Sequence, residues 1–218
     1  MKFLTLNFSD TIFEETIMSI IQTGLSARES EYPVHDLIRG RWSPRAMSGE
    51  RLSNTELFRL FEAAKWAPSA YNEQPWRILY VLRDTPEWKL FFDLFVEFNQ
   101  SWIVNAGALI LFLSRKTSSH NGAPLQTSSF DTGAAWQNLA IEGVSQDLVV
   151  HAMQGFDYER ARKDLGIPDF MKVEAMVAVG KPAPIDKLPQ ALREKEKPSN
   201  RRPLSKTVAQ GKWNEALA

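Results

Sequence analysis

The chain alternates between segments whose apolar residues have helical spacing and segments whose apolar residues have strand-like spacing. Ser53 and Glu56 have the spacing of a capping box, in which each side chain satisfies a free backbone N–H, and Pro68 ends the helix that follows. Apolar residues three and four positions apart predict further helices at residues 86–98, 129–144 and 158–165. Short segments rich in β-branched and aromatic residues predict strands at residues 76–83, 108–113, 148–153 and 173–179. Because helices and strands alternate without a strict β-α-β order, we expect an α+β fold rather than a doubly wound sheet.

The two ends of the chain differ from this alternating region. Apolar residues from Ile12 to Ile21 have helical spacing, which predicts an amphipathic helix that docks on the protein or frays. Acidic residues at positions 10, 14 and 15 interrupt this stretch and argue against a secretory signal. Residues 187–218 are charged and contain three prolines, so we expect an arm that runs over a surface. We therefore predict an N-terminal extension of residues 1–32 and a single domain of residues 33–218.

Composition and charge exclude several classes of function. The chain has 26 basic and 26 acidic residues, and this balance argues against nucleic acid or an anionic membrane as the main partner. It has no cysteine, which excludes disulfides, iron–sulfur clusters, thiolate zinc sites and cysteine nucleophiles. The three histidines lie far apart in sequence, so no metal site is expected. No apolar run approaches the ~20 residues of a membrane helix, and the cytoplasm is the default location. Neither a Rossmann fingerprint nor a P-loop motif is present.

The first candidate for chemistry is the basic segment from Arg39 to Arg45. It holds three arginines and the hydroxyl of Ser43 within seven residues. Guanidinium groups match phosphate oxygens two at a time, and a serine hydroxyl can donate a further hydrogen bond, so this segment can form an anion site. Taken alone, it is also explained by a solvated basic turn, because runs of charge are usually solvated.

The second candidate is the segment from Ala67 to Trp76, which joins a predicted helix to a predicted strand. It carries two prolines and the amides of Asn72 and Gln74. A rigid loop of this kind can direct an amide, with its donors and its acceptor, at a planar heterocycle. The alternative is that Pro, Ser and Asn only form the turn and that Trp76 only packs.

The polar segment at residues 115–128 contains Asn-Gly and Pro and predicts a mobile loop.

Taken together and in order, these segments resemble the nitroreductase family of FMN-dependent oxidoreductases. The resemblance runs from about His35 to Leu204. Within the family, the chain is most similar to the flavin/nitroreductase branch, in which the basic turn reads Arg-Trp-Ser-Pro-Arg. The segments that carry it are Arg41-Trp42-Ser43-Pro44-Arg45, Ala67-Pro68-Ser69-Ala70-Tyr71-Asn72-Glu73-Gln74-Pro75-Trp76, Asp131-Thr132-Gly133-Ala134-Ala135-Trp136-Gln137-Asn138-Leu139, Ala152-Met153-Gln154-Gly155-Phe156-Asp157, Leu165-Gly166-Ile167-Pro168, Val179-Gly180-Lys181-Pro182 and Arg201-Arg202-Pro203-Leu204.

The resemblance implies a fold and an assembly. The fold is a nitroreductase-like mixed central sheet flanked by helices, in an intertwined homodimer that exchanges its C-terminal arms. Pro68, Ser69 and Ala70 would touch the flavin of the other subunit, so that a monomer would be incomplete.

The resemblance also implies a bound FMN and a role for each matching residue. Arg41 and Ser43 would grip the FMN phosphate, with Arg201 or Arg202 adding a second guanidinium and Trp42 lying beside them. Arg45 would sit near flavin N1 and O2, where a cation stabilises the reduced, anionic ring. The further contacts would come from Asn72 on the pyrimidine edge, from Met153 and Gln154 beside the ring, and from the backbone near Gly155 at N5.

The implied activity is a ping-pong transfer of hydride. NAD(P)H would act as a substrate that visits the flavin, and a small planar acceptor such as a nitroaromatic, a quinone or free flavin would take the same place. No side chain need act as acid or base, because the flavin carries the redox chemistry. Gln154 departs from the glycine or glutamate of relatives. That departure keeps open an FMN storage or delivery protein with little turnover, and a flavin-free dimer is the third hypothesis.

Overall fold

The computed structural model describes residues 20–217, and the chain falls into two compact units. Residues up to Trp42 form the first unit together with residues from Lys197 onward, and Ser43–Glu196 form the second. Most of the amphipathic helix predicted between Ile12 and Ile21 lies outside the described residues, although residues 20–26 are helical. No helix within residues 20–217 is both long enough and apolar enough to cross a membrane.

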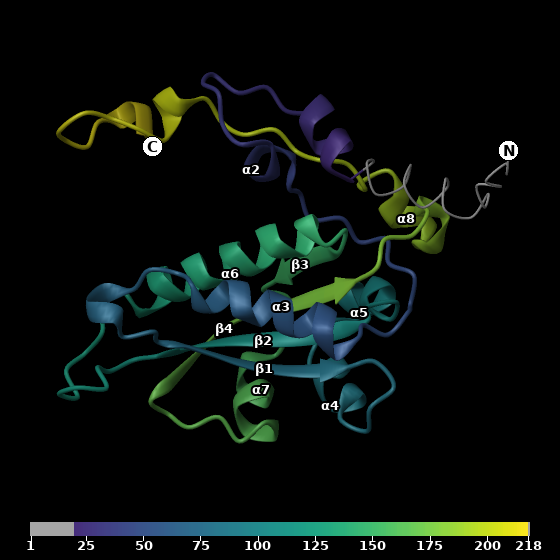
Figure 1. Ribbon diagram of the computed structural model, residues 1–218, viewed down its shortest axis with the longest axis horizontal. Helices are drawn as coiled ribbons and strands as arrows, with labels where there is room; N and C mark the ends of the chain where they lie inside the picture. Colours follow the sequence, from purple (N-terminus) through teal and green to yellow (C-terminus); the bar gives the residue numbers. More distant parts are fainter. Residues whose placement is uncertain (1–19, 218) are drawn as a thin grey trace, which may run out of the picture. The chain divides into compact units, whose positions relative to one another are not determined.

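The second unit is built on a four-stranded sheet in the order β1-β2-β4-β3 (Figure 1). Its strands are β1 (Trp76–Leu82), β2 (Ala108–Arg115), β3 (Val149–Met153) and β4 (Met171–Gly180), close to the predicted ranges. The three pairings are all antiparallel, so the prediction of a mixed sheet is wrong for the described strands. The reason is the connectivity: residues 83–107 join β1 to β2, residues 154–170 join β3 to β4, and each connection returns the chain at the same end of the sheet, so that the next strand runs in the opposite direction.

Two helices cover one face of this sheet and complete the core. Helices α3 (Asn54–Lys65) and α6 (Ser128–Ser145) pack against each other, and α6 contacts β1, β2 and β3 (Figure 1). The apolar residues of α3 contribute to this core: Leu57, Leu60 and Ala64 are fully buried, and Phe61 is partly buried against them. Their neighbours in the core are Phe112, Leu139, Val150, Val177 and Val179. Helix α7 (Tyr158–Asp164) contacts β4.

The start of α3 confirms the predicted capping box. Ser53 Oγ accepts the backbone N–H of Glu56 at 3.2 Å, and the Glu56 carboxylate accepts the Ser53 backbone N–H at 2.7 Å. Both groups would otherwise be free donors at the first turn of the helix. The helix ends at Lys65, three residues before Pro68.

We expect Ser53→Ala to lower the free energy of unfolding by about 1 kcal/mol, because one orphan N–H of α3 loses its acceptor. Urea unfolding followed by circular dichroism measures the change. Ser145→Ala is the matched control, since Ser145 is exposed at the C-terminal end of α6 and its hydroxyl donates only to the Glu142 carbonyl. Equal stability of the two variants would contradict the role assigned to the cap.

The prediction of a single helix at residues 86–98 is wrong. The segment forms two short helices, α4 (Trp88–Phe92) and α5 (Glu97–Ile103), with a break between them. Phe95 makes an isolated antiparallel bridge to Phe156, and the Val96 N–H donates to the Gly155 carbonyl at 3.2 Å. These contacts with a distant segment take the backbone groups that a continuous helix would use.

The polar segment at residues 115–128 closes on itself. Thr117 bridges Pro124, the Ser118 N–H donates to the Ala123 carbonyl at 2.7 Å, and the Leu125 N–H donates to the Lys116 carbonyl at 2.8 Å. The segment therefore forms a small hairpin-like projection, and we call residues 116–125 the polar hairpin. The remaining elements of this unit are η1 (Ala70–Asn72), η2 (Ile185–Lys187) and α8 (Gln190–Arg193).

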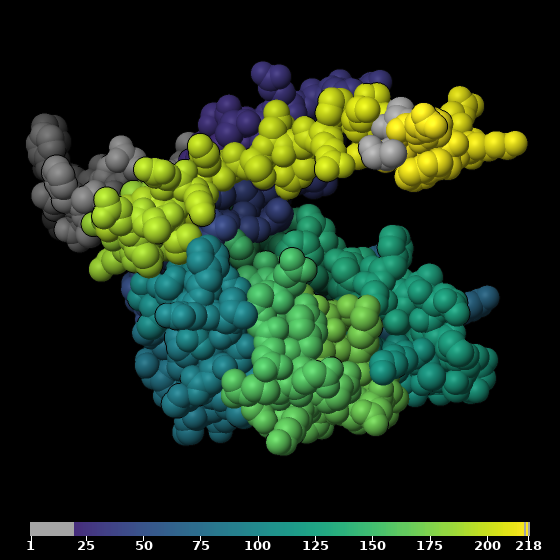
Figure 2. Space-filling view, turned by 180° about the vertical axis from the view of Figure 1, so that it is seen from behind, coloured from purple at the N-terminus to yellow at the C-terminus, as the bar shows by residue number. Residues whose placement is uncertain are grey.

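The first unit brings the two ends of the described chain together. Residues 20–42 and the first part of the segment 197–217 run alongside each other in both views, and the yellow end of that segment extends beyond them (Figures 1 and 2). Its elements after residue 26 are α2 (Asp36–Gly40), η3 (Leu204–Lys206) and η4 (Glu215–Leu217). A Cβ atom placed on Gly24 would lie only 1.9 Å from the Gly40 carbonyl oxygen. The helical residues 20–26 therefore pack on α2 at a distance that only glycine allows.

Candidate functional site

Three arginines form a cluster in the first unit. Arg28 is only 8% exposed and donates to the carbonyls of Arg39 at 2.8 Å, of Ser199 at 3.0 Å, and of Arg41. Burial, and then the charge of Arg201, lowers the pKa of Arg28. Burial, and then the charges of Arg28 and Arg201, lowers the pKa of Arg41. Neutral carbonyl groups thus hold Arg28 close to two like charges, and a cluster of guanidinium groups favours an anion.

The structure places two arginines that are distant in the sequence near the same third arginine. Arg41 and Arg201 lie 160 positions apart, yet each is within electrostatic reach of Arg28. Arg202 and Arg201 also line a pocket of about 650 Å³ in the same unit. Sequence reasoning missed Arg28, because it belongs to no motif and its role follows only from the three carbonyls that surround it.

Trp42 has a structural task within the first unit. Its indole is 8% exposed, and the Nε1–H donates to the Ile20 carbonyl at 3.0 Å. This bond ties the helical residues 20–26 to the end of the Arg39–Trp42 segment. A ligand would therefore meet the ring or the backbone of Trp42, because the indole N–H is already engaged.

Arg45 lies near the start of the second unit and is ion-paired with Glu196 near the end of the same unit. The Arg45 guanidinium lies 3.4 Å from the Glu196 carboxylate, whose side chain is 5% exposed. The same carboxylate accepts the backbone N–H groups of Arg45 and of Ala46, the latter at 3.0 Å. The positive charge predicted for the flavin edge is thus largely balanced by an acid that the sequence did not indicate.

Helix α5 links Arg45 to the middle of β3. The Arg45 guanidinium lies over the Trp102 ring, 5.9 Å from its centroid. The Trp102 ring also contacts the His151 ring on β3, with 4.8 Å between their centroids, and His151 Nδ1 lies 3.0 Å from the Pro44 carbonyl. These contacts connect Pro44 and Arg45 to α5 and β3 within the second unit.

One turn earlier on α5, Asn99 fixes the segment after β3. Its side-chain amide donates to the Gly155 carbonyl at 2.9 Å. A Cβ on Gly155 would come 2.6 Å from Asn99 Nδ2, so any side chain at residue 155 would displace the Asn99 amide from this contact. The Gly155 N–H donates to no acceptor within residues 20–217. It is therefore available to a ligand beside Gln154, which is exposed, and Met153, which is 7% exposed.

The turn that carries Asn72 has an unusual backbone. Tyr71, Asn72 and Gln74 have φ angles of 51°, 55° and 47°, a left-handed conformation that non-glycine residues seldom adopt. Such a conformation costs about 1–3 kcal/mol per residue and persists only when the surroundings hold it. The carboxamide of Asn72 forms no hydrogen bond with another residue from 20 to 217 and is exposed.

The ends of this turn are anchored by side chains. The Ser69 hydroxyl accepts the Gln74 N–H at 3.0 Å, and the Asp131 carboxylate on α6 accepts the Ala70 N–H at 3.1 Å. Pro68, the remaining member of the predicted set, is exposed.

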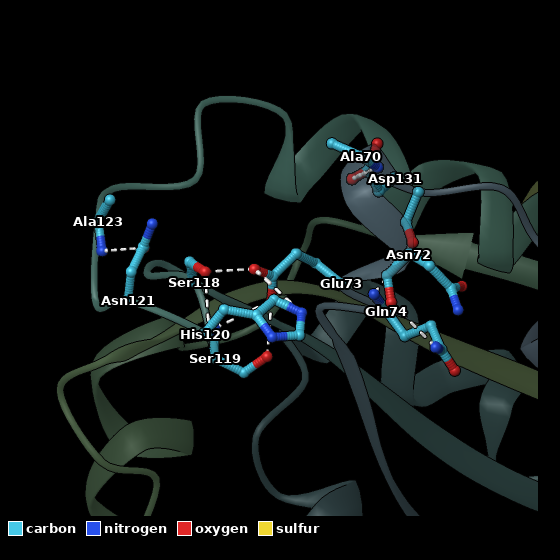
Figure 3. Close-up of polar contacts among 11 residues, drawn as sticks. Ala70, Asn72, Glu73, Gln74, Ser118, Ser119, His120, Asn121, Ala123 and Asp131 are labelled. Carbon is cyan, nitrogen blue, oxygen red and sulfur yellow. Dashed lines mark hydrogen bonds and ion pairs between the residues drawn. The ribbon is translucent and has the colours of Figure 1, made fainter.

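A third anchor was missed from the sequence: Glu73, between the left-handed Asn72 and Gln74. Its carboxylate accepts the Ser118 hydroxyl, the Ser119 N–H at 3.0 Å and the Ser119 hydroxyl at 2.8 Å (Figure 3). The bond from Ser118, followed by that from the Ser119 amide, lowers the pKa of Glu73 to about 2. The stabilisation that this carboxylate provides is therefore fully present above its ordinary pKa and is lost only as the pH falls toward about 2.

Comparison with known proteins decides the family. The model of the nitroreductase family matches residues 38–181, about two thirds of the chain. The chain belongs to the nitroreductase family. This match includes the basic turn, the Asn72 turn and the Gly155 segment, whereas Arg28 and Arg201 lie outside it.

Solved structures and a sequence relative agree with this membership. A structure described as an oxidoreductase containing FMN is 43% identical, with a TM-score of 0.82, and covers 86% of this chain and 96% of its own. A "putative nitroreductase in complex with FMN" from Desulfovibrio desulfuricans is 25% identical, with a TM-score of 0.65, over 85% of this chain and 100% of its own. A "Putative NADH dehydrogenase/NAD(P)H nitroreductase" of Archaeoglobus fulgidus is 29% identical over 67% of this chain and 83% of its own.

Proposed function

We propose that this nitroreductase-family protein is an FMN-dependent oxidoreductase that uses NAD(P)H to reduce small planar acceptors such as nitroaromatics, quinones or free flavin. The observation that carries the proposal is the cluster of Arg28, Arg41 and Arg201, which favours an anion such as a phosphate. The FMN named for the relative of 43% identity supports the same assignment.

The phosphate end of FMN would be held by guanidinium groups and a hydroxyl. Arg41 and Arg201 offer planar forks that match phosphate oxygens, Arg202 is the alternative to Arg201, and Ser43 supplies a hydroxyl. Arg28 has a different task, since it donates to the Arg41 carbonyl and to the Ser199 carbonyl and so holds both neighbouring backbones.

The ring end would be held by groups that lack partners among the described residues. The free carboxamide of Asn72 suits the pyrimidine edge, and the free N–H of Gly155 suits N5. Arg45 would act near N1 and O2 as half of an ion pair with Glu196, which moderates its charge. Bound FMN would supply the chemistry of hydride transfer between NAD(P)H and an acceptor, in the ping-pong order that the resemblance implies.

The proposed assembly is a homodimer with exchanged C-terminal arms, in which Pro68, Ser69 and Ala70 meet the partner's flavin. Large apolar side chains that are exposed on α3, η1 and α6 support a second copy of the chain as their cover. These side chains are Phe58, Trp66, Tyr71 and Phe130.

We expect the FMN-loaded protein to have the mass of a dimer, because the site would be incomplete in one chain. Light scattering after size-exclusion chromatography gives the mass, and the flavin absorbance of the same peak gives its occupancy. A stable monomer that carries FMN would contradict the shared site.

Anaerobic mixing of the FMN-loaded protein with NADPH or NADH tests the activity itself. An oxidoreductase is expected to lose its visible flavin band within seconds, and the band is expected to return when a quinone is added. A flavin that stays oxidised with both nicotinamides would instead show an FMN storage or delivery protein.

A further inference from the structure

Asn72 lies in a left-handed turn that is partly held by its own hydrogen bonds. The Asn72 N–H donates to the Ser69 carbonyl at 3.0 Å, and the Asn72 carbonyl accepts the side-chain amide of Gln74 at 3.0 Å. Tyr71 is 93% exposed and the carboxamide of Asn72 is free, so neither side chain anchors the left-handed residues at the centre of the turn. Ser69 and Asp131 fix only its two ends, at Gln74 and Ala70. A side-chain contact between those ends and a segment outside the turn would restrict Asn72 further.

Glu73 makes that contact. Its side chain is 3% exposed and points away from the turn toward the polar hairpin, as Figure 3 shows. Two serines supply three donors to the carboxylate, and His120 Nε2 lies 3.9 Å from it. Because Glu73 follows Asn72 directly, fixing its side chain also restricts the peptide that sets the direction of Asn72.

The polar hairpin that Glu73 contacts is held by its own hydrogen bonds. The Ser118 N–H donates to the Ala123 carbonyl, and the Leu125 N–H donates to the Lys116 carbonyl. The Ser118 hydroxyl, which donates to Glu73, also accepts the His120 N–H at 3.1 Å, and Ser118 is 7% exposed. The carboxylate thus joins two segments that lie 45 positions apart in the sequence.

We propose that Glu73 is a positioning residue, which holds Asn72 in the orientation that binds the pyrimidine edge of FMN by anchoring the Asn72 turn to Ser118 and Ser119 of the polar hairpin. The inference rests on the proposed function, because it assigns FMN as the ligand of Asn72. It adds a residue whose side chain touches the hairpin and acts on the cofactor through its neighbour.

A double-mutant cycle between Glu73 and Asn72 tests the proposal in the full-length protein. In the otherwise unchanged chain, Glu73→Gln is expected to raise the Kd for FMN about tenfold, since a glutamine keeps the size but offers one acceptor atom where the carboxylate offers two. In an Asn72→Ala background the same substitution is expected to leave the Kd unchanged, because the group that it positions is gone. Glu62→Gln is the matched control, since Glu62 is exposed on α3 and bonded only to Lys65 and Trp66.

Two further measurements distinguish the proposed positioning role of Glu73 from a purely structural role. Ser118→Ala removes a donor to the same carboxylate, so it should raise the Kd in the same direction and add little to Glu73→Gln. Hydrogen exchange at the Ser119 amide of the apoprotein should quicken in Glu73→Gln, and this reading needs no flavin. An unchanged Kd in Glu73→Gln, or an equal increase with and without Asn72, would overturn the proposal. Absence of FMN binding by the unchanged chain would instead overturn the proposed function, while the exchange rate would still report on the anchor.

Discussion

Arg41→Glu is expected to weaken FMN binding by roughly 2–5 kcal/mol, which raises the Kd from about 30-fold to several thousand-fold. The substitution removes a cation from the arginine cluster and puts an anion beside Arg28 and Arg201. The new carboxylate would form ion pairs with the remaining guanidinium groups and repel a phosphate. Titration of the apoprotein with FMN, followed by quenching of flavin fluorescence, measures the change.

Arg51→Glu is the control for this charge reversal, because Arg51 is exposed and lies outside the cluster. Its Kd is expected to stay close to that of the unchanged protein. Unaltered FMN affinity in Arg41→Glu would remove Arg41 from the phosphate site.

Phe112→Ala is expected to lower the free energy of unfolding by about 3–5 kcal/mol, the largest change of stability that we predict. Phe112 is 1% exposed at the centre of β2, where it is paired in register with Ile78 and Ala175. Its removal leaves a cavity beneath α3 and α6 that the surrounding side chains fill only in part. Urea unfolding gives the value.

Phe170→Ala provides the comparison, since Phe170 is 53% exposed in the turn before β4. Phe170→Ala is expected to lower the free energy of unfolding by much less than Phe112→Ala does. Similar losses at the two positions would mean that the core is not where the structure places it.

The elements that the sequence predicted well are those fixed by local patterns. The capping box at Ser53 uses only residues three positions apart, and the buried run of β2 is apolar at every position from 108 to 113. The break between α4 and α5 was missed, because it depends on Phe156 and Gly155, about 60 positions away. The antiparallel sheet depends likewise on which strands become neighbours, and apolar spacing alone does not specify this.

The candidate site divides in the same way. Arg41, Asn72 and Gly155 were found through motifs whose order resembles a known family. Arg28, Glu73 and Glu196 were missed, because each acts through atoms that are distant in the sequence. Buried charged residues such as Arg28 and Glu196 look like ordinary surface residues until their partners are known. The structure therefore adds the residues that orient the binding groups rather than further binding groups.

The central claim is that this chain holds FMN, and the visible spectrum of the purified full-length protein, before and after addition of FMN and removal of the excess, tests it most directly. The account predicts a retained flavin band, with FMN released on denaturation at close to one molecule per chain. A colourless protein that retains no flavin after incubation would contradict the account and leave a flavin-free member of the family.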